Sequence, residues 1–243
     1  MRSDSFLRPV WPSLLGAAGL MSTRAGGVSA APFDSMNLRA PHERDDASDD
    51  AQAVRENRRR YAQACGAQPV YLRQVHGARV VHLGQADLHT GATVHEADAS
   101  ITTELGVACT VLVADCLPVL FAAPGGRGVA AAHAGWRGLA GGVLEATVAL
   151  LTQASGCPAS ELHAWLGACI GPREFEVGED VLQAFGASAA EPEPHFAPGM
   201  RAGKWLADLP SLARMRLQAA GVTQISGGHW CTVEDRSRFF SFR

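Results

Sequence analysis

The sequence predicts an α/β (α+β) fold in which strands and helices follow one another in mixed order. The chain has 243 residues, of which 47% are hydrophobic, so it can bury a core large enough for one large domain or two small ones. Strand-like apolar runs and runs with helical periodicity do not alternate strictly, which favours an α+β or layered α/β/α arrangement over a doubly wound sheet. The sequence lacks a G-x-G-x-x-G turn and a P-loop lysine motif, so it indicates no nucleotide cofactor of those two kinds.

The N-terminal region contains an apolar stretch from 9 to 20 that could be mistaken for an export signal. Pro9 and Pro12 interrupt this stretch, so we expect neither a signal helix nor a membrane span. The six cysteines form no C-x-x-C pair and no regular framework, which argues against structural disulfides. These features predict a reducing compartment, and we expect the protein to be cytoplasmic.

The charge of the chain argues against a nucleic-acid partner. The net charge is −3, whereas a phosphate-binding face requires a clear basic excess. The run Arg58-Arg59-Arg60 belongs to a helical pattern that also contains Glu56. We therefore expect this run to be a solvated helix face and not a polyanion patch.

Two features precede the first predicted strand of the main domain. Gly26-Gly27 marks a turn at which the backbone can approach a ligand, with Arg24 as a nearby donor, although residue types alone favour an ordinary surface loop. A helix is predicted over 51–64, with Asp49 or Asp50 as its N-cap and a glycine at its end.

The segment 69–83 is predicted to form a β-hairpin whose turn contains His76 next to Gly77. A histidine in such a turn can aim its ring into a cleft, but a single histidine among the nine in this chain is more often structural or solvated. A strand is predicted from 97 to 101. Asp98 at its start is either a turn residue or an acceptor that orients a ligating imidazole.

The centre of the chain contains the residues on which the functional prediction depends. An apolar run at 110–114 is predicted to be a buried strand that ends close to Cys116. Two further strands are predicted at 118–123 and 128–132, joined by a Pro-Gly-Gly turn. Because these strands are neighbours, we expect Cys116 and His133 to lie at nearby strand ends.

After His133, a glycine-rich turn leads into a helix predicted over 143–151. Such a turn leaves backbone N–H groups free to face an anion, and Arg137 adds a planar fork suited to phosphate or carboxylate. The remaining predicted elements are a strand at 161–170, helices at 177–185 and 209–220, and a strand at 222–226.

His76, Cys116 and His133 could supply a catalytic zinc site, which generally has three protein ligands and an open fourth position. Their spacing is no signature, and two other chemistries compete for the same atoms. Cys116 and His133 could form a nucleophile and its base, with Asp98 or Asp115 orienting the imidazole. A copper electron-transfer centre would need an axial methionine, which no motif places there.

A set of short motifs runs in order through nearly the whole chain. They are S-T-R-A-G-G-V-S at 22–29, N-L at 37–38, Q-V-H-G at 74–77, A-D-C-L-P-V at 114–119, A-H-A-G-W-R-G at 132–138, I-G-P at 170–172, and C-T with F-F-S-F-R between 231 and 243. These motifs resemble the purine nucleoside phosphorylase family, which is also called the laccase-domain or multicopper polyphenol oxidase family and includes peptidoglycan editing factors.

The resemblance implies a single layered α/β/α/β domain with mixed sheets, which would occupy 22–243 after an N-terminal lead segment at 1–21. It also implies a zinc site, sometimes reported with copper, formed by His76, Cys116 and His133. The activities it implies are phosphorolysis of adenosine, inosine, guanosine and methylthioadenosine, with adenosine deamination as a further one.

The resulting hypothesis is a zinc-dependent purine nucleoside phosphorylase whose ligands are a purine nucleoside and phosphate. We expect Arg137, with Arg24, to hold phosphate beside the cationic sugar, where it stabilises charge and acts as the nucleophile. In deamination, Asp115 is the expected proton acceptor for a metal-activated water. The alternatives are a hydrolase that edits peptidoglycan precursors, a copper polyphenol oxidase, and a non-enzymatic binding module. The preferred nucleoside and the oligomeric state are left open.

Overall fold

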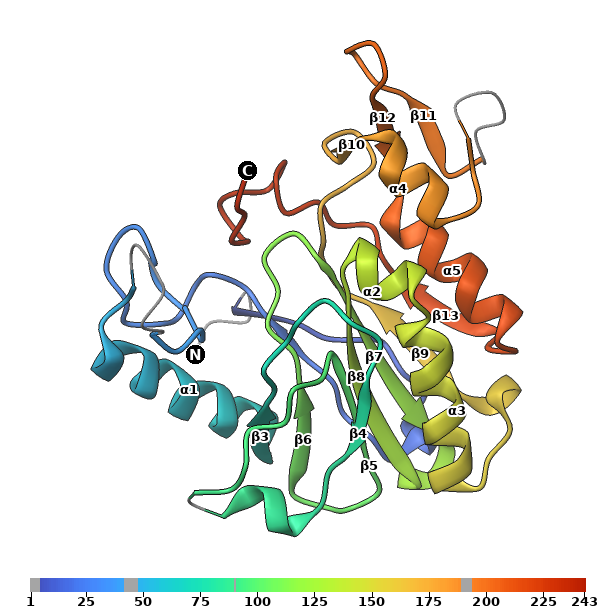
Figure 1. The fold of residues 1–243 in the computed structure, drawn as a ribbon. Coiled ribbons are helices and arrows are strands. Elements are labelled where there is room, and N and C mark those ends of the chain that lie inside the picture. Colours follow the sequence, from blue (N-terminus) through green and yellow to red (C-terminus); the bar gives the residue numbers. More distant parts are fainter. Residues whose placement is uncertain (1–4, 42–47, 90, 189–193) are drawn as a thin grey trace.

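The computed structural model describes residues 5–41, 48–89, 91–188 and 194–243. Its centre is a six-stranded sheet in which parallel and antiparallel pairs are mixed (Figure 1). In spatial order the strands are β13 (Gln224–Gly227), β9 (His163–Leu166), β7 (Leu117–Ala123), β8 (Gly128–Ala134), β5 (Ala99–Thr102) and β4 (Val80–His82).

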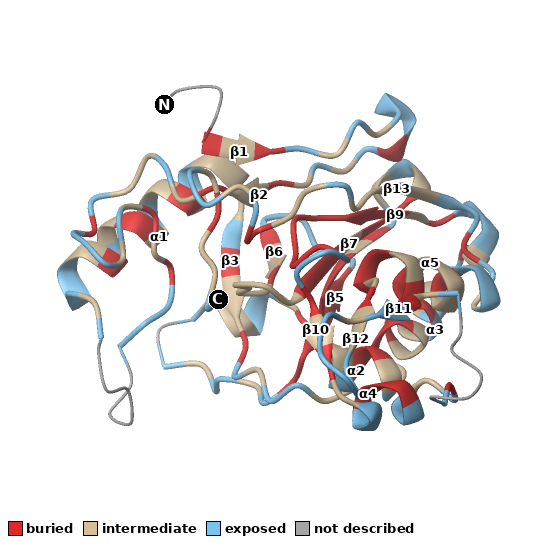
Figure 2. Cartoon of the chain, turned by 90° about the horizontal axis from the view of Figure 1, so that it is seen from above, coloured by how far each residue is buried: buried red, intermediate tan, exposed pale blue. Residues whose placement is uncertain are grey.

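Both faces of this sheet are covered by other parts of the chain. Alternate side chains of a strand point to opposite faces, so neighbouring residues of one strand pack against different layers. Val119 and Phe121 of β7 belong to the main core, which they share with α3 (Val143–Ser155) and α5 (Leu209–Ala219). Leu120, between them, packs against a second cluster on the other face. The four helices α2 to α5 therefore lie on one side of the sheet and the N-terminal strands on the other (Figure 2).

The N-terminal residues form that second covering layer. β1 (Phe6–Leu7) pairs antiparallel with β2 (Met21–Ser22). Leu7 and Met21 pack with Trp165 of the central sheet in the cluster that also contains Leu120. The division into a lead segment at 1–21 and a domain at 22–243 stays a prediction, although the described part of the lead segment is packed against the central sheet.

A helix and a small parallel sheet stand beside the central sheet. α1 (Ala51–Cys65) begins at the N-cap Asp50, whose carboxylate accepts the N–H of Ala53, and ends at Gly66 with φ 66°. This confirms the helix predicted over 51–64. The helix packs against β3 (Gln68–Tyr71), which pairs in parallel with β6 (Val107–Thr110).

The hairpin predicted over 69–83 is wrong. β3 and β4 belong to different sheets, and each finds a parallel partner further along the chain, β3 in β6 and β4 in β5. The strand predicted at 110–114 is also misplaced, since β6 ends at Thr110. Beyond that point the side chain of Gln74 replaces a neighbouring strand, because it donates to the carbonyl of Leu112 at 2.9 Å and accepts its N–H at 2.7 Å.

The other predicted elements agree better with the structure. The predicted strands at 118–123 and 128–132 are β7 and β8, and the helices predicted at 143–151 and 209–220 are α3 and α5. A three-stranded sheet was not expected from the sequence. Its strands are β10 (Glu176–Val177), β11 (Phe196–Pro198) and β12 (Trp205–Ala207). The helix predicted at 177–185 is α4 (Glu179–Ala184), and the remaining helix is α2 (Trp136–Ala140).

The absence of structural disulfides agrees with the sequence pattern, since all six cysteines are free thiols. In the described parts of the chain, no helix has both the length and the apolar character needed to cross a membrane. The fold class predicted from the sequence, α/β with mixed sheets, is confirmed by the arrangement of these layers.

Candidate metal centre

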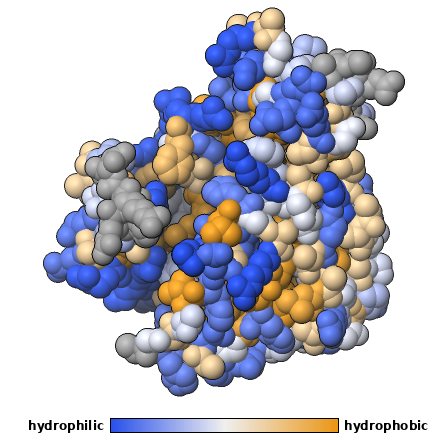
Figure 3. Space-filling model, in the orientation of Figure 1, coloured by the Kyte–Doolittle hydropathy of each residue, from blue (hydrophilic) through white to orange (hydrophobic). Residues whose placement is uncertain are grey.

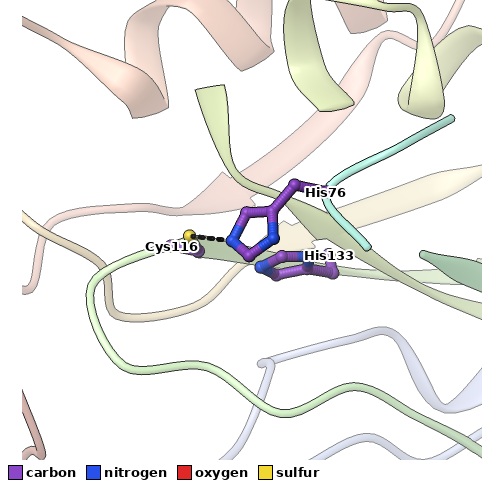
Figure 4. Close-up of side chains that lie close together, drawn as sticks. All are labelled: His76, Cys116 and His133. Atoms are coloured by element: carbon purple, nitrogen blue, oxygen red, sulfur yellow. Dashed lines mark hydrogen bonds between the residues drawn. The ribbon is translucent and has the colours of Figure 1, made fainter. Parts of the chain in front are cut away.

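The antiparallel pair β7 and β8 brings Cys116 and His133 together. Cys116 directly precedes β7, and the register of the pair places Pro118 opposite His133. His76 comes from a different direction, from the connection between β3 and β4. Figure 4 shows the three side chains gathered at one point, with the imidazole of His76 directed toward the sulfur of Cys116.

The spacing of the three side chains suits a shared ion. The Sγ atom of Cys116 lies 3.9 Å from Nε2 of His76, and the two imidazole centroids are 4.7 Å apart with planes at 78°. One ligand atom from each residue can be chosen so that all lie within 4.8 Å of one another. In a tetrahedral zinc site, sulfur and nitrogen ligands would be about 3.5 Å apart, so small side-chain movements would close this cluster around an ion.

Asp98 fixes the position of both histidines. Its carboxylate is fully buried and accepts a hydrogen bond from Nδ1 of His133 at 2.8 Å. The same carboxylate accepts the backbone N–H groups of Val75, His76 and Gly77 at 3.1, 2.9 and 2.7 Å. Of the two roles considered for Asp98, the structure therefore supports that of the acceptor that orients an imidazole, which leaves Nε2 of His133 free for a ligand.

His76 has a backbone conformation that residues other than glycine seldom adopt, with φ 61°. Three successive N–H groups that converge on one buried carboxylate hold the loop in this conformation. The physical reason that the segment 69–83 is no hairpin is thus visible here, because its turn bonds to Asp98 and not across to a second strand.

The electrostatic environment differs between the two histidines. Burial opposes a charge on His133, but hydrogen bonds to Asp98 and Cys116 outweigh it and raise the pKa of His133 to about 9. Partial burial, with the nearby charges of His133 and Arg137, lowers the pKa of His76. The surroundings of His133 therefore stabilise positive charge, whereas those of His76 favour a neutral ring with a free lone pair.

Arg137 is the one of the three predicted catalytic residues whose side chain forms neither a hydrogen bond nor an ion pair with another described residue. It is exposed, its guanidinium carbon lies 4.3 Å from the centroid of the Trp136 ring, and it lines the same cavity as the three candidate ligands. Within the described residues it has no carboxylate partner. Its terminal nitrogens are consequently available to an anion.

Arg24 is tied to two other segments of the chain. Its Nε donates to the carbonyl of Asp34 at 2.8 Å, its Nη2 lies 3.1 Å from the Asp34 carboxylate, and its Nη1 donates to the carbonyl of Arg236 at 3.0 Å. The guanidinium also stacks on Phe240, at 5.0 Å from the ring centroid. These contacts leave little of the guanidinium fork for a phosphate.

Asp115 is tied to the last residues of the chain in a similar way. The hydroxyl of Thr232 donates to its Oδ1 at 2.6 Å, and the N–H of Phe242 donates to its Oδ2 at 2.8 Å. Asp115 also adopts a left-handed backbone conformation, with φ 82°. Its carboxylate thus anchors the segment that ends at Arg243 beside the strand end that contains Cys116.

These side chains surround one large cavity of about 1540 Å³. Residues of the candidate metal cluster, the segment from Phe239 to Arg243 and α1 all contribute to its wall. In the space-filling view, this face of the molecule is hollowed between the region of α1 and the central sheet (Figure 3). A cavity of this kind can take a ligand of the size of a nucleoside with room to spare.

Comparison with known proteins places the chain among relatives. Residues 18–243 match the family described as multi-copper polyphenol oxidoreductase laccase. The chain belongs to this laccase family. A purine nucleoside phosphorylase from Pseudomonas aeruginosa is 50% identical over 240 residues, which cover 99% of this chain and 93% of the relative. The purine nucleoside phosphorylase YfiH from Escherichia coli is 45% identical over 239 residues, with 97% and 91% covered.

Two solved structures have the laccase-family fold seen here. The Neisseria meningitidis protein NMB0706 is 42% identical, with a TM-score of 0.85, over 98% of this chain and 93% of that one. YlmD from Geobacillus stearothermophilus is 31% identical, with a TM-score of 0.87, over 99% and 91%. The predicted family resemblance and fold class are confirmed by these matches.

Two contacts in this member of the laccase family could not be predicted from the sequence. Thr232 and Phe242 hydrogen-bond to Asp115 across 117 and 127 positions of the chain. No periodicity or spacing connects residues so far apart. The motifs C-T at 231–232 and F-F-S-F-R at 239–243 were the available signals, since they indicated special positions without indicating a partner.

Gly135, the N-cap of α2, provides the space that the cluster occupies. A Cβ atom built there would lie 2.9 Å from Sγ of Cys116 and 3.1 Å from Cδ2 of His76. We expect Gly135→Ala to displace both side chains and to weaken zinc binding by about tenfold or more. Competition with a chromophoric chelator measures this change, with the melting temperature of the metal-free variant as a control for folding. Unchanged zinc affinity would show that the ion is not held where these three side chains meet.

Proposed function

We propose that this protein is a zinc-dependent purine nucleoside phosphorylase. The observation on which this depends is the group of His76, Cys116 and His133, whose ligand atoms lie within 4.8 Å of one another in the wall of a large cavity. Relatives at 50% and 45% identity are named purine nucleoside phosphorylases, which supports assigning phosphorolysis to this cavity.

The donor set fits zinc. Two imidazole nitrogens and one thiolate are ligands that zinc accepts readily, and three protein ligands leave a fourth position for substrate or water. When bound, zinc would polarise a substrate oxygen or lower the pKa of a water. Asp98 holds the Nδ1–H of His133, so that the other nitrogen of this ring is the one presented to the ion.

Arg137 is the residue that we assign to phosphate. Its guanidinium is held in place by the Trp136 ring and has no carboxylate partner among the described residues. In phosphorolysis, an oxygen of hydrogen phosphate forms a bond to C1′ of the ribose while the bond from C1′ to the purine breaks. The proton of the phosphate passes to the purine nitrogen, which gives ribose 1-phosphate and the free base. A guanidinium that orients the phosphate supports this step through proximity and through charge stabilisation.

For Arg24 and Asp115 we propose positioning roles. Both hold the segment from Arg236 to Arg243 at the edge of the cavity, Arg24 through a backbone carbonyl and Phe240, and Asp115 through the N–H of Phe242. The proton-acceptor role expected for Asp115 in deamination would require it to release one of its two donors. Adenosine deamination therefore remains a secondary part of this proposal.

The test is release of purine base from a nucleoside in the presence and absence of phosphate. We expect Arg137→Gln to raise KM for phosphate by about tenfold to a hundredfold, because a charge-assisted contact is lost, while the zinc content stays at the wild-type level. Arg127→Gln is the matched control. Arg127 lies in the connection between β7 and β8, at the end of these strands away from Cys116 and His133, and it pairs with Glu161 at 3.1 Å. Equal phosphate dependence in both variants would contradict the assignment.

The same preparation decides the substrate class. Adenosine, inosine, guanosine and methylthioadenosine are compared with and without phosphate, and ammonia release from adenosine measures deamination. Cleavage of a serine-bearing peptidoglycan precursor without phosphate would indicate the editing hydrolase instead. Oxygen consumption with a phenol would indicate the oxidase that the family description names.

A further inference from the structure

The wall of the cavity also includes residues of α1 and β3, which pack against each other and lie side by side in Figure 1. We call this the second part of the cavity. Its wall includes Arg58, Tyr61 and Cys65 from α1, Tyr71 from β3, and Arg8 from the N-terminal layer. The total volume of about 1540 Å³ exceeds the upper end, about 1,000 Å³, of what small-molecule pockets usually enclose. A nucleoside and a phosphate at the metal cluster would therefore leave this second part unfilled.

Arg58 is held in a fixed orientation in this part of the cavity. Its Nε donates to the backbone carbonyl of Leu38 at 2.8 Å, and its guanidinium carbon lies 3.9 Å from the centroid of the Tyr71 ring. One hydrogen bond and one stacking contact fix the plane of the guanidinium. Within the described residues, its two terminal nitrogens have neither a hydrogen-bond partner nor a carboxylate.

The two neighbouring arginines on the same helix differ from Arg58, because each forms an ion pair with a carboxylate. Arg59 and Arg60 both bind Glu56, at 2.7 and 2.8 Å. The run Arg58-Arg59-Arg60, which was expected to be a solvated helix face, therefore contains one arginine that is half-buried. Burial lowers the pKa of Arg58. A half-buried cation without an anion costs free energy, which a ligand with negative charge would recover.

A second arginine, Arg8, lines the same part of the cavity. Arg8 stacks loosely on Phe6, at 5.9 Å from the ring centroid, and has no acidic partner in the described part of the chain. Burial raises the pKa of the Cys65 thiol to about 11, against the charge of Arg8, and raises the pKa of Tyr71 to about 12, against the charge of Arg58. Arg8 and Arg58 both line this cavity together with Cys65 and Tyr71, so both cations contribute positive charge to the same part of its wall.

We propose that Arg58, assisted by the charge of Arg8, forms an anion-binding subsite in this part of the cavity, and that it takes the phosphate or carboxylate group of an organic ligand. Tyr71 is five positions before His76, so the chain between them spans at most about 18 Å. An elongated ligand could reach both places. This reach to the reaction centre rests on the proposed function, whereas binding of the anion by Arg58 does not.

Site-resolved NMR of the full isotope-labelled chain tests the subsite. The Nε–H group of Arg58 is bonded to Leu38, which slows its exchange with water, and its signal is assigned by its loss in Arg58→Lys. We expect titration with inorganic phosphate to shift this signal along a saturating curve. The Arg59 signal is the matched control, because its guanidinium already binds Glu56 through two nitrogens and should not saturate.

Further arms identify the source of the anion. AMP and glutarate replace inorganic phosphate in separate titrations, and the probe that saturates at the lowest concentration identifies a phosphate ester, a carboxylate or free phosphate. We expect Arg8→Gln to weaken the interaction severalfold and Arg58→Gln to remove it, while equilibrium dialysis should show one fewer phosphate bound per chain in Arg58→Gln.

Two results would overturn the subsite. One is an Arg58 signal that does not move with any of the three probes, and the other is movement in parallel with Arg59. Arg137→Gln separates this inference from the proposed function, since it should leave the Arg58 titration unchanged. Loss of base release in that variant with an intact Arg58 shift would concern the reaction centre alone.

Discussion

Asp98→Ala is expected to abolish zinc binding and to destabilise the fold by about 3–5 kcal/mol. The substitution removes the acceptor of three backbone N–H groups and of the His133 ring, all in a fully buried position. The loop that presents His76 would lose the contacts that maintain its left-handed conformation. Chemical denaturation of the metal-free protein gives the free energy of unfolding, and metal analysis gives the zinc content.

Two further variants make this result specific. Asp98→Asn keeps the shape and one acceptor oxygen, so we expect the fold to persist and the zinc affinity to fall by about tenfold to a hundredfold, because the amide no longer selects the Nδ1–H form of His133. Asp87→Ala is the matched control, since Asp87 also binds a histidine, His95, at 2.7 Å and a backbone N–H, that of Gly84, at 2.9 Å, but lies outside the cluster. Wild-type zinc affinity in Asp98→Asn would contradict the orienting role.

The second large effect is expected from the candidate ligands themselves. Removal of any one of His76, Cys116 or His133 leaves two protein ligands, which is too few for a stable catalytic site. We expect His133→Ala and Cys116→Ser to lose zinc and to reduce phosphate-dependent base release by several orders of magnitude. His82→Ala is the control, because His82 is an exposed residue of β4 that does not belong to the cluster.

The activity assay and the metal analysis must agree for this interpretation to stand. If His133→Ala lost its zinc but released base at the wild-type rate, the ion would have no part in phosphorolysis, and the cluster would have to be structural. A loss of activity with full zinc content would instead show that His133 acts directly on the substrate.

Local signals in the sequence predicted the part of the site that depends on near neighbours. β7 and β8 are joined by a short Pro-Gly-Gly turn, so their antiparallel pairing and the closeness of Cys116 to His133 could be expected. The caps at Asp50 and Gly66 likewise marked α1, because capping is a contact within one turn of chain. The place of His76 beside them was expected from the family resemblance, not from spacing.

Contacts between residues far apart in the sequence could not be predicted from local patterns. The segment 69–83 has the composition of a hairpin, but each of its strands finds a parallel partner elsewhere, and parallel pairing leaves no turn signal in the sequence. The roles of Arg24 at the phosphate and of Asp115 at a water stay predictions. Their contacts with segments more than a hundred positions away could not be predicted from the sequence. Arg58 was expected in solvent because its run is charged, whereas the ring of Tyr71 and the carbonyl of Leu38 hold it half-buried in the wall of the cavity.

The most direct test of the shared metal site is X-ray absorption at the zinc edge of the purified, zinc-loaded protein. We predict a first coordination shell with one sulfur at about 2.3 Å and lighter ligands, two of them imidazole nitrogens, at about 2.0–2.1 Å, and we predict that the sulfur contribution disappears in Cys116→Ser. A zinc shell without sulfur in the wild-type protein, or a sulfur contribution that persists in Cys116→Ser, would contradict a site built from His76, Cys116 and His133.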